Sequence, residues 1–398
     1  MKFLIINTDY PDFLHWFYAQ HPGLEDRPYK EQLDARSESL FGVADFYSTN
    51  LIQLGHEARE LHANNEWIQR AWAREHHIMV HEPAIAVRKG TSLLRRVPAV
   101  AASAPVRWLK SCAWPLLRQR MEQDDSWFYA ILSAQIKHYR PDVILNQDMG
   151  GVSATFLAEM KPHYRFLIGQ HAATRLTMDS SFQCYDLMIS SFPPTVDFFR
   201  RRGFLAALNR LGFDSRILAR LRPTQQKFDV ALVGSFADVH SSRVALLNEL
   251  YAKLPRPETI KVWAPTVGHL PVESPIRRHY MGPAWGYHMY EILNDSKMTL
   301  NHHGDVLPYA NNMRLFESTG TGTLLITDWK ENLYEMFESG KEVVTYRTPE
   351  ECAEKIQHYL THEAERQTIA SAGQARTLRD HTYQCRMQEF MGLVCRYI

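Results

Sequence analysis

Short apolar runs alternate along this chain with segments whose apolar residues recur at helical spacing. In the first part the runs are KFLII, DVILNQ, RFLIGQ and DLMISS, which begin at residues 2, 142, 165 and 186. Amphipathic segments lie between them, around 39–54, 67–76 and 125–139. This alternation is typical of βα units and predicts a parallel sheet.

The alternation starts again after a polar stretch that contains proline, ARLRPTQQKF at 219–228. The apolar runs that follow are FDVALVGS, TIKVWA, KMTLNHH, TLLITD and EVVTY. Near the end of this part, Thr348 is expected to cap a helix that starts at Pro349, with Glu351 completing a capping box. We therefore expect two consecutive α/β domains joined near residue 222.

Length and composition fit this picture and exclude several classes of protein. A chain of 398 residues exceeds what one core usually supports, and a net charge of +1 gives no reason to expect nucleic-acid binding. The five cysteines are scattered and lack CxxC spacing, which argues against a disulfide framework or a structural zinc site. The first apolar run is too short for a secretory signal, and no run of 18 apolar residues occurs. We expect a cytoplasmic protein.

One segment, 88–120, differs from the rest of the chain. It carries eight Arg or Lys residues and no Asp or Glu, with Trp, Leu and Val interleaved and three prolines. It is either a solvated insertion in the first domain or a basic, aromatic-rich surface for anionic lipid headgroups or a lipid-phosphate acceptor. The second interpretation would place the protein peripherally at the inner face of a membrane.

The stretch NNMRLFESTGTGTLLITD, 311–328, carries candidate chemistry on a helix that leads into a strand. Asn311 or Asn312 can cap the helix, whose free amides attract phosphate. Arg314 in the first turn would bind a diphosphate, and Glu317, three residues on, could accept from both hydroxyls of a ribose. Gly320 is expected to end the helix. The alternative is an ordinary surface ion pair between Arg314 and Glu317.

A second group of candidates follows the first strand of the second domain. Gly234 and Ser235 come at the end of the run VALVGS, where a glycine lets the backbone approach a ligand. Arg243 lies on the helix that follows, and it is either a second phosphate ligand or a solvated side chain.

Three stretches of the second half resemble the GT-B fold glycosyltransferases, in particular the CgeB-like (spore protein glycosyltransferase-like) family. They are NMRLFESTGTGTLLITD, EMFESGKEVVTY and IASAGQARTLRDHTYQCR, and the resemblance covers 228–386. It implies two Rossmann-like, doubly wound parallel-sheet domains that face each other across a cleft. The acceptor domain would span 1–222 and the nucleotide-sugar donor domain 223–382, with a helix over 383–398 crossing back to the first domain.

The resemblance also implies a function, a glycosyltransferase (hexosyltransferase-type) of polysaccharide biosynthesis. It would move a sugar from a nucleoside-diphosphate sugar to a hydroxyl of a glycan, protein or small-molecule acceptor, with retention favoured over inversion and no metal or other cofactor. Glu317 matches the glutamate that holds the donor ribose. Related enzymes carry another glutamate eight residues earlier, where this chain has Tyr309, so Asp305 or Asn312 would have to take over that contact.

The candidate site residues come from the residue patterns and from the family resemblance together. His171 and Asp148 follow strands of the first domain and are the catalytic candidates, either one serving as general base if transfer inverts, and His171 bonding the donor sugar if it retains. His302 and its neighbour His303 are donor-site lining rather than metal ligands, because adjacent residues on a strand point in opposite directions. The donor-binding candidates are Gly234, Ser235, Arg243, His302, Asn312, Arg314, Glu317, Gly320 and Thr321.

Three other functions compete with this interpretation. A nicotinamide oxidoreductase would need GxGxxG after its first strand, and LIINTDYPDFLHW contains no glycine. A nucleotide-sugar epimerase of the same fold would use cleft carboxylates and no acceptor. A non-catalytic nucleotide-sugar-binding protein of envelope or coat assembly would keep the donor site and lack turnover.

Overall fold

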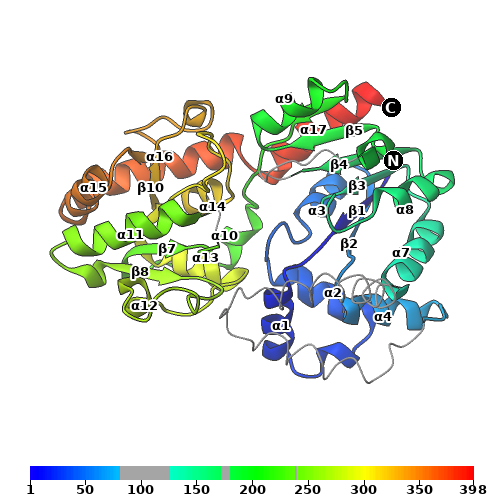
Figure 1. The fold of residues 1–398 in the computed structure, drawn as a ribbon, viewed down its shortest axis with the longest axis horizontal. Helices are drawn as coiled ribbons and strands as arrows, with labels where there is room; N and C mark the ends of the chain where they lie inside the picture. The colour runs from blue at the N-terminus through cyan, green and yellow to red at the C-terminus, as the bar shows by residue number, and fades with distance from the viewer. Residues whose placement is uncertain (81–125, 172–179, 238–239) are drawn as a thin grey trace, which may run out of the picture.

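The chain folds into two α/β domains, each built on its own parallel sheet. A computed structural model describes residues 1–80, 126–171, 180–237 and 240–398. The two domains lie side by side, the N-terminal one on the right in Figure 1 and the C-terminal one on the left. Segment 88–120, with its proposed lipid contact, lies outside the described residues.

Within the described residues, the N-terminal domain has six strands in the order β2-β1-β3-β4-β5-β6, with parallel pairing throughout. Alternate residues of β1 enter two different cores, Phe3 and Ile5 on one face and Leu4 and Ile6 on the other. The sheet is thus buried on both faces, as a doubly wound fold requires. The strands are β1 (Lys2–Asn7), β2 (Glu57–His62), β3 (Val143–Asn146), β4 (Phe166–Gln170), β5 (Leu187–Ser190) and β6 (Ala206–Leu208). The described helices are α1 (Pro11–Gln20), α2 (Tyr29–Glu38), α3 (Phe46–Gln53), α4 (Glu66–Glu75), α7 (Ser126–Tyr139), α8 (Ala154–Glu159), α9 (Pro193–Arg200) and α10 (Arg216–Arg220).

The C-terminal domain has five parallel strands in the order β11-β10-β9-β7-β8. They are β7 (Phe228–Val233), β8 (Ile260–Trp263), β9 (Ser296–Asn301), β10 (Leu324–Asp328) and β11 (Val344–Tyr346). The helices are α11 (Ser241–Lys253), α12 (Pro275–Arg278), α13 (Tyr287–Asn294), α14 (Arg314–Gly320), α15 (Pro349–Thr361), α16 (Glu363–Asp380) and α17 (Tyr383–Tyr397). The fold class expected from the sequence, two domains with doubly wound parallel sheets, is confirmed.

The structure corrects three local expectations. Strands β2 and β6 did not stand out in the sequence, and the segment 39–54 becomes helical only from Phe46. At the start of α15, the Thr348 hydroxyl accepts from the Glu351 amide at 3.2 Å as expected. The Glu351 carboxylate, however, accepts from the amide of Arg347 instead of that of Thr348, so the capping box is incomplete.

Two chain crossings join the domains. Phe213, in the first crossing, exchanges backbone hydrogen bonds with His381 and Tyr383 in the second. Helix α17, red in Figure 1, then lies on the N-terminal domain and packs against α3. The buried Arg386 of α17 donates to the carbonyl of Leu211 and to the ring of His381. The HTYQCR stretch therefore fastens the two crossings together.

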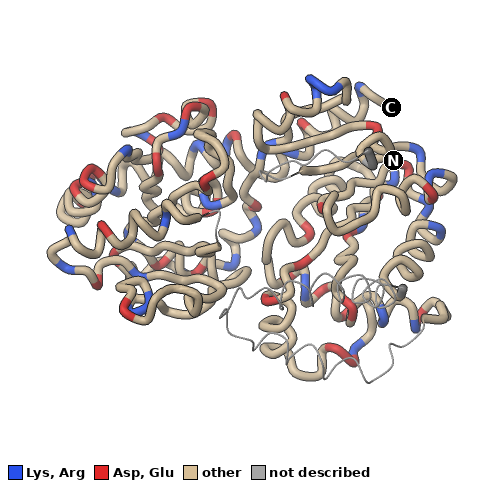
Figure 2. The backbone as a smooth tube through the Cα atoms, viewed as in Figure 1, with Lys and Arg blue, Asp and Glu red and all other residues tan. Residues whose placement is uncertain are grey.

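The domains also meet through their loops. The ring of Phe192, after β5, lies edge-on to Tyr309, after β9, with 6.0 Å between ring centroids. Because both rings follow the carboxyl ends of strands, the carboxyl edges of the two sheets are turned toward each other here. Figure 2 shows basic and acidic residues interspersed over the described parts of both domains, which agrees with the small net charge.

Candidate functional site

Arg243 is a buried cation at the carboxyl edge of the C-terminal sheet. It lies in the first turn of α11 and donates to the carbonyl oxygens of Ser235, at 2.7 Å, and His302, at 2.5 Å. A Cβ atom on Gly234 would come within 2.8 Å of its guanidinium. Burial, together with the charge of Arg314, lowers the pKa of Arg243 to about 10, so it stays charged at neutral pH. Gly234 thus gives room to Arg243, and the alternative of a solvated Arg243 is wrong.

His302 is held on both sides of its ring. Its Nδ1 lies 2.9 Å from the hydroxyl of Tyr346, and its Nε2 lies 2.9 Å from that of Ser242. Burial lowers the pKa of His302, which favours the neutral ring. Asp305 closes this end of the site, because its carboxylate accepts from the Ser242 amide at 3.0 Å and from the Ser241 hydroxyl at 2.8 Å. Both contacts fix the loop after β9 on the first turn of α11.

Helix α14 carries Arg314 and Glu317 but starts differently from the expectation. Its first flanking residue is Met313, and no side chain caps it. Asn312 instead donates to the Asn301 side chain at 2.9 Å, so the predicted asparagine cap is wrong. Arg314 Nη1 lies 2.9 Å from Glu317 Oε2, and both side chains are almost fully buried. The pair is therefore not an ordinary surface ion pair.

The surroundings of Glu317 act on the pKa of its carboxyl group in two opposite directions. Burial raises the pKa of Glu317, while the Arg314 charge opposes this effect. The Arg314 Nε atom is buried and has no partner among the described residues. A ligand that offers hydroxyl groups and an anionic group would match both side chains.

Gly320 and Thr321, also donor candidates, make packing contacts in this structure. A Cβ atom on Gly320 would lie 2.5 Å from the ring of Phe213 in the first crossing. The Thr321 hydroxyl donates to the carbonyl of Ser318 at 2.9 Å. Helix α14 ends at Gly320 as expected, but the left-handed residue that follows is Gly322, with φ 81°. A ligand contact of Gly320 or Thr321 stays a prediction.

The two catalytic candidates follow β3 and β4 in the N-terminal domain. Asp148 Oδ1 accepts from the amides of Gly150 and Gly151, and Oδ2 accepts from the Thr8 hydroxyl at 2.7 Å. This carboxylate thus shapes its own turn and ties it to the end of β1. His171 is half-buried, with its amide bonded to the carbonyl of Ile189 and its ring 6.2 Å from that of Phe199. The segment that follows, 172–179, lies outside the described residues.

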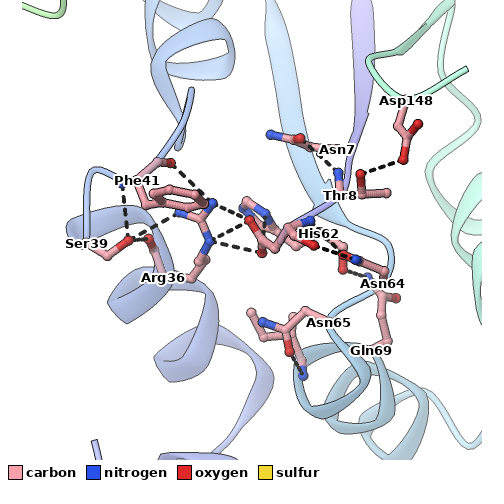
Figure 3. A network of polar contacts seen from close by, with 12 residues as sticks. Asn7, Thr8, Arg36, Ser39, Phe41, His62, Asn64, Asn65, Gln69 and Asp148 are labelled. Carbon is pink, nitrogen blue, oxygen red and sulfur yellow. Dashed lines mark hydrogen bonds and ion pairs between the residues drawn. The ribbon is translucent and has the colours of Figure 1, made fainter. Parts of the chain in front are cut away.

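Sequence reasoning missed a buried network at the ends of β1 and β2 (Figure 3). Arg36 pairs with Asp9 through Nε and Nη2, and His62 Nδ1 lies 3.2 Å from Asp9. Although burial acts to raise it, the pKa of Asp9 is held well below its usual range by Arg36 and His62. His62 ends a strand that mixes Glu, Arg and Leu, so the only signal in the sequence was a polar group, Asn7 to Asp9, after the first strand.

This network extends to the contact between the domains. Arg36 also donates to the carbonyl of Phe41, and the carbonyl of Ser39 accepts from the amide of Tyr287 in the other domain at 2.7 Å. The ring of Phe41 lies edge-on to Trp285, with 5.1 Å between centroids. The buried pair thus orders the segment that meets the C-terminal domain.

Several solved structures share this arrangement of two sheets. Anabaena HepE, crystallised with UDP-glucose, matches with a TM-score of 0.59 and 11% identity over 100% of both chains. The sucrose-phosphate synthase of Thermosynechococcus elongatus matches at 0.57 and 11%, over 100% of this chain and 98% of that one. A Rickettsia africae glycosyltransferase matches at 0.54 and 10%, over 98% and 97%. The chain has the GT-B fold.

The family comparison agrees with the fold. The model of the family described as glycosyl transferase-like matches residues 209–392 of this GT-B chain, which include both arginines and Glu317. That part of the chain is therefore glycosyl transferase-like, while the narrower CgeB-like assignment stays a prediction. No curated protein matches the sequence.

Two further observations concern metals and membranes. Within the described residues, no group of three or more His, Cys, Asp or Glu side chains is arranged to hold a metal ion. Over the same residues, no helix combines the length and apolar character needed to cross a bilayer.

Proposed function

We propose that this GT-B chain is a hexosyltransferase that moves a sugar from a nucleoside-diphosphate sugar to an acceptor hydroxyl. The observation that carries the proposal is the buried Arg243 and the largely buried Arg314 with Glu317 beside the loop that follows β9. Arg243 is fixed by two carbonyl oxygens and is close enough to Arg314 for the two charges to interact. The complexes of HepE with UDP and with UDP-glucose support a nucleotide-sugar donor.

The two arginines would supply positive charge for the leaving nucleoside diphosphate. Glycosyl transfer leaves negative charge on the nucleoside diphosphate, and fixed cations stabilise that charge as it develops. Lys330, 3.0 Å from Asp328 at the end of β10, adds a third cation. With this set we propose a reaction that requires no metal. Glu317 would hold the ribose hydroxyls, which ties the orientation of the nucleotide to that of α14.

The N-terminal domain would hold the acceptor. Phe192, which follows β5 of its sheet, contacts Tyr309 of the donor domain, so an acceptor bound there reaches the transferred sugar. We favour retention of configuration, with His171 bonding the donor sugar. Because one oxygen of Asp148 is engaged within its turn and the other by the Thr8 hydroxyl, this residue would act by positioning that turn. The acceptor is a glycan, a protein or a small molecule, and we propose a cytoplasmic enzyme.

The test is a binding measurement followed by an assay of turnover. We expect UDP, GDP or dTDP to raise the melting temperature of the protein, because a ligand at 100 times its Kd stabilises the folded state by about 2.7 kcal/mol. Arg243→Gln should abolish the shift. The control Arg256→Gln changes an exposed arginine of the same domain and should keep it. If none of the three nucleotides shifts the wild type, the proposal is overturned.

Incubation with the matching nucleotide sugar separates the remaining alternatives. Release of nucleoside diphosphate that depends on an added acceptor identifies transfer. A new nucleotide sugar formed from the donor alone would identify an epimerase, and binding without any turnover would identify a non-catalytic protein.

A further inference from the structure

His303 forms a buried dyad with Asp328 at the carboxyl edge of the C-terminal sheet. Its Nδ1 lies 2.7 Å from Asp328 Oδ1, and its backbone amide donates to the same oxygen at 3.0 Å. Only 2% of His303 is exposed. Because an ionised carboxylate accepts and does not donate, the hydrogen is on Nδ1. The pairing therefore fixes both the orientation of the ring and its tautomer.

Asp328 is itself held for this role. It ends β10, which runs parallel to β9 and places Thr327 opposite Asn301. Lys330 Nζ lies 3.0 Å from its second oxygen. Although burial acts in the opposite direction, the hydrogen bond from His303 and the charge of Lys330 keep the pKa of Asp328 well below its usual range. The carboxylate thus stays ionised and keeps its hydrogen bond to the ring of His303.

The other ring nitrogen of His303 has no hydrogen-bond partner among the residues that the structure describes. Its Nε2 atom is buried and makes no hydrogen bond within the described part of the chain. The neighbouring His302 differs, since both of its ring nitrogens are bonded, to Tyr346 and Ser242. A buried polar atom left without a partner is unfavourable, and each such exception in a folded protein calls for an explanation, such as a functional contact or a bound water.

The surroundings indicate what that ligand is. Arg243 donates to the carbonyl of His302, the residue before His303, so the backbone that leads into His303 lies beside the proposed diphosphate site. A sugar hydroxyl both donates and accepts, and would bond Nε2 in either protonation state of the ring. A phosphate oxygen only accepts, and the arginines already provide for it.

We propose that His303 is a recognition residue for the transferred sugar, with Nε2 hydrogen-bonded to one of its hydroxyl groups and Asp328 as the positioning residue. This inference rests on the proposed function. It means that a residue of the donor domain, His303, determines which sugar is accepted. The side chains that cover Nε2 must shift to let the hydroxyl reach it, because this atom is closed off from solvent in the ligand-free protein.

Two variants of His303 separate its two ring nitrogens. In His303→Asn the amide can still bond Asp328 but does not reach the position of Nε2, whereas in His303→Gln it reaches further. The probes are UDP with UDP-glucose, GDP with GDP-mannose, and dTDP with dTDP-glucose, and the pair that the wild type binds is used for calorimetry. We expect His303→Asn to weaken binding of the nucleotide sugar about tenfold, with the Kd of the nucleoside diphosphate changed less than twofold. His303→Gln should recover part of the loss.

A second measurement needs no variant. Deoxy analogues of the bound nucleotide sugar, each lacking one hydroxyl, should bind the wild type equally well except for one, which should bind about tenfold more weakly. That analogue should also bind His303→Asn no more weakly than the complete nucleotide sugar does.

The outcomes are distinct. Equal weakening of nucleotide and nucleotide sugar by His303→Asn, or no weakening of either, overturns the role of His303 and leaves the proposed function intact. The second of these results would assign a bound water to Nε2. Failure of the wild type to bind any of the three nucleoside diphosphates overturns the proposed function and this inference together.

Discussion

Arg243 illustrates what can and cannot be predicted for a single residue. Its place at the start of a helix after a strand was visible in the sequence. Its partners were not, because the carbonyl of His302 lies 59 residues away along the chain. Gly234 was predicted to admit a ligand, and the structure shows that it admits the arginine. In both cases the residue type was informative and the contact depended on the tertiary fold.

Glu317 gives the most direct prediction for the donor site. Glu317→Gln keeps the size of the side chain and removes the charge that would accept from the ribose. We expect the KM for the nucleotide sugar to rise by an amount equivalent to about 1–3 kcal/mol, as measured by steady-state kinetics. The control is Glu338→Gln, an exposed glutamate of the same domain. An unchanged KM in a folded Glu317→Gln protein would remove this residue from donor binding.

Glu60 predicts a pH dependence of stability. It is buried beside the amide of Ser48, and burial raises its pKa from 4.5 to about 8. The folded state therefore binds a proton that the unfolded state has lost, and this contribution to stability falls as the pH rises from 4.5 toward 8. Glu60→Gln removes the penalty, so the variant should gain on the order of 3 kcal/mol over the wild type between pH 5 and pH 8.

The measurement is urea unfolding at both pH values. Glu57→Gln, in the same strand but at an exposed position, is the matched control and should show no such gain. A Glu60→Gln protein whose advantage is the same at pH 5 and pH 8 would contradict the prediction.

At the scale of elements, the strong apolar runs predicted strands well and the weak ones did not. Nine strands coincide with apolar runs that the sequence displays. Strand β2 was missed because its residues EARELH put Glu60 and His62 in the interior, where they are accommodated by a buried polar network. Strand β6 has only three residues, too few for a periodic pattern. Buried polar side chains and short length are the physical reasons for both failures.

Replacing a glycine by alanine should have opposite effects on protein stability in α14 and in α17. Gly320→Ala would place a methyl group against the ring of Phe213, and overpacking of this kind costs about 1–3 kcal/mol. Gly392→Ala lies in α17, where nothing is within 4 Å of the added atom. It should stabilise the protein by about 0.5–1 kcal/mol. Thermal unfolding of both variants checks the pair, and a Gly320→Ala protein as stable as the wild type would contradict the packing.

At the scale of the whole molecule, the order of apolar runs was enough to predict two parallel-sheet domains. The family resemblance predicted a helix that crosses back to the first domain, but the residue contacts through which the domains meet were not predictable. The network of Asp9, Arg36 and His62 joins the ends of two strands and a helix, and its residues are widely separated in the sequence. Their association depends on the tertiary fold, so no local spacing in the sequence predicts it.

Trp285 predicts how firmly the domains are joined. It is buried against Phe13 and Phe41 of the other domain. Trp285→Ala should remove about 3–5 kcal/mol of packing and loosen the contact, so that small-angle scattering reports a larger radius of gyration. Trp263→Ala removes a tryptophan that packs against Phe228 within one domain. It should destabilise that domain without changing the radius, and an equal expansion of both variants would contradict the assignment.

Helix α17 is synthesised after every other described element, yet its Met387 and Phe390 share a core with Phe3 and Phe46 near the other end of the chain. On the ribosome, the apolar side chains of the first domain that pack on α17 therefore stay uncovered by it until residues 383–397 have emerged. In an excised fragment that stops after β6, those apolar side chains would stay exposed to solvent. For anyone dividing this protein into separately expressed halves, the natural partner of the first half is a peptide from the far end of the second.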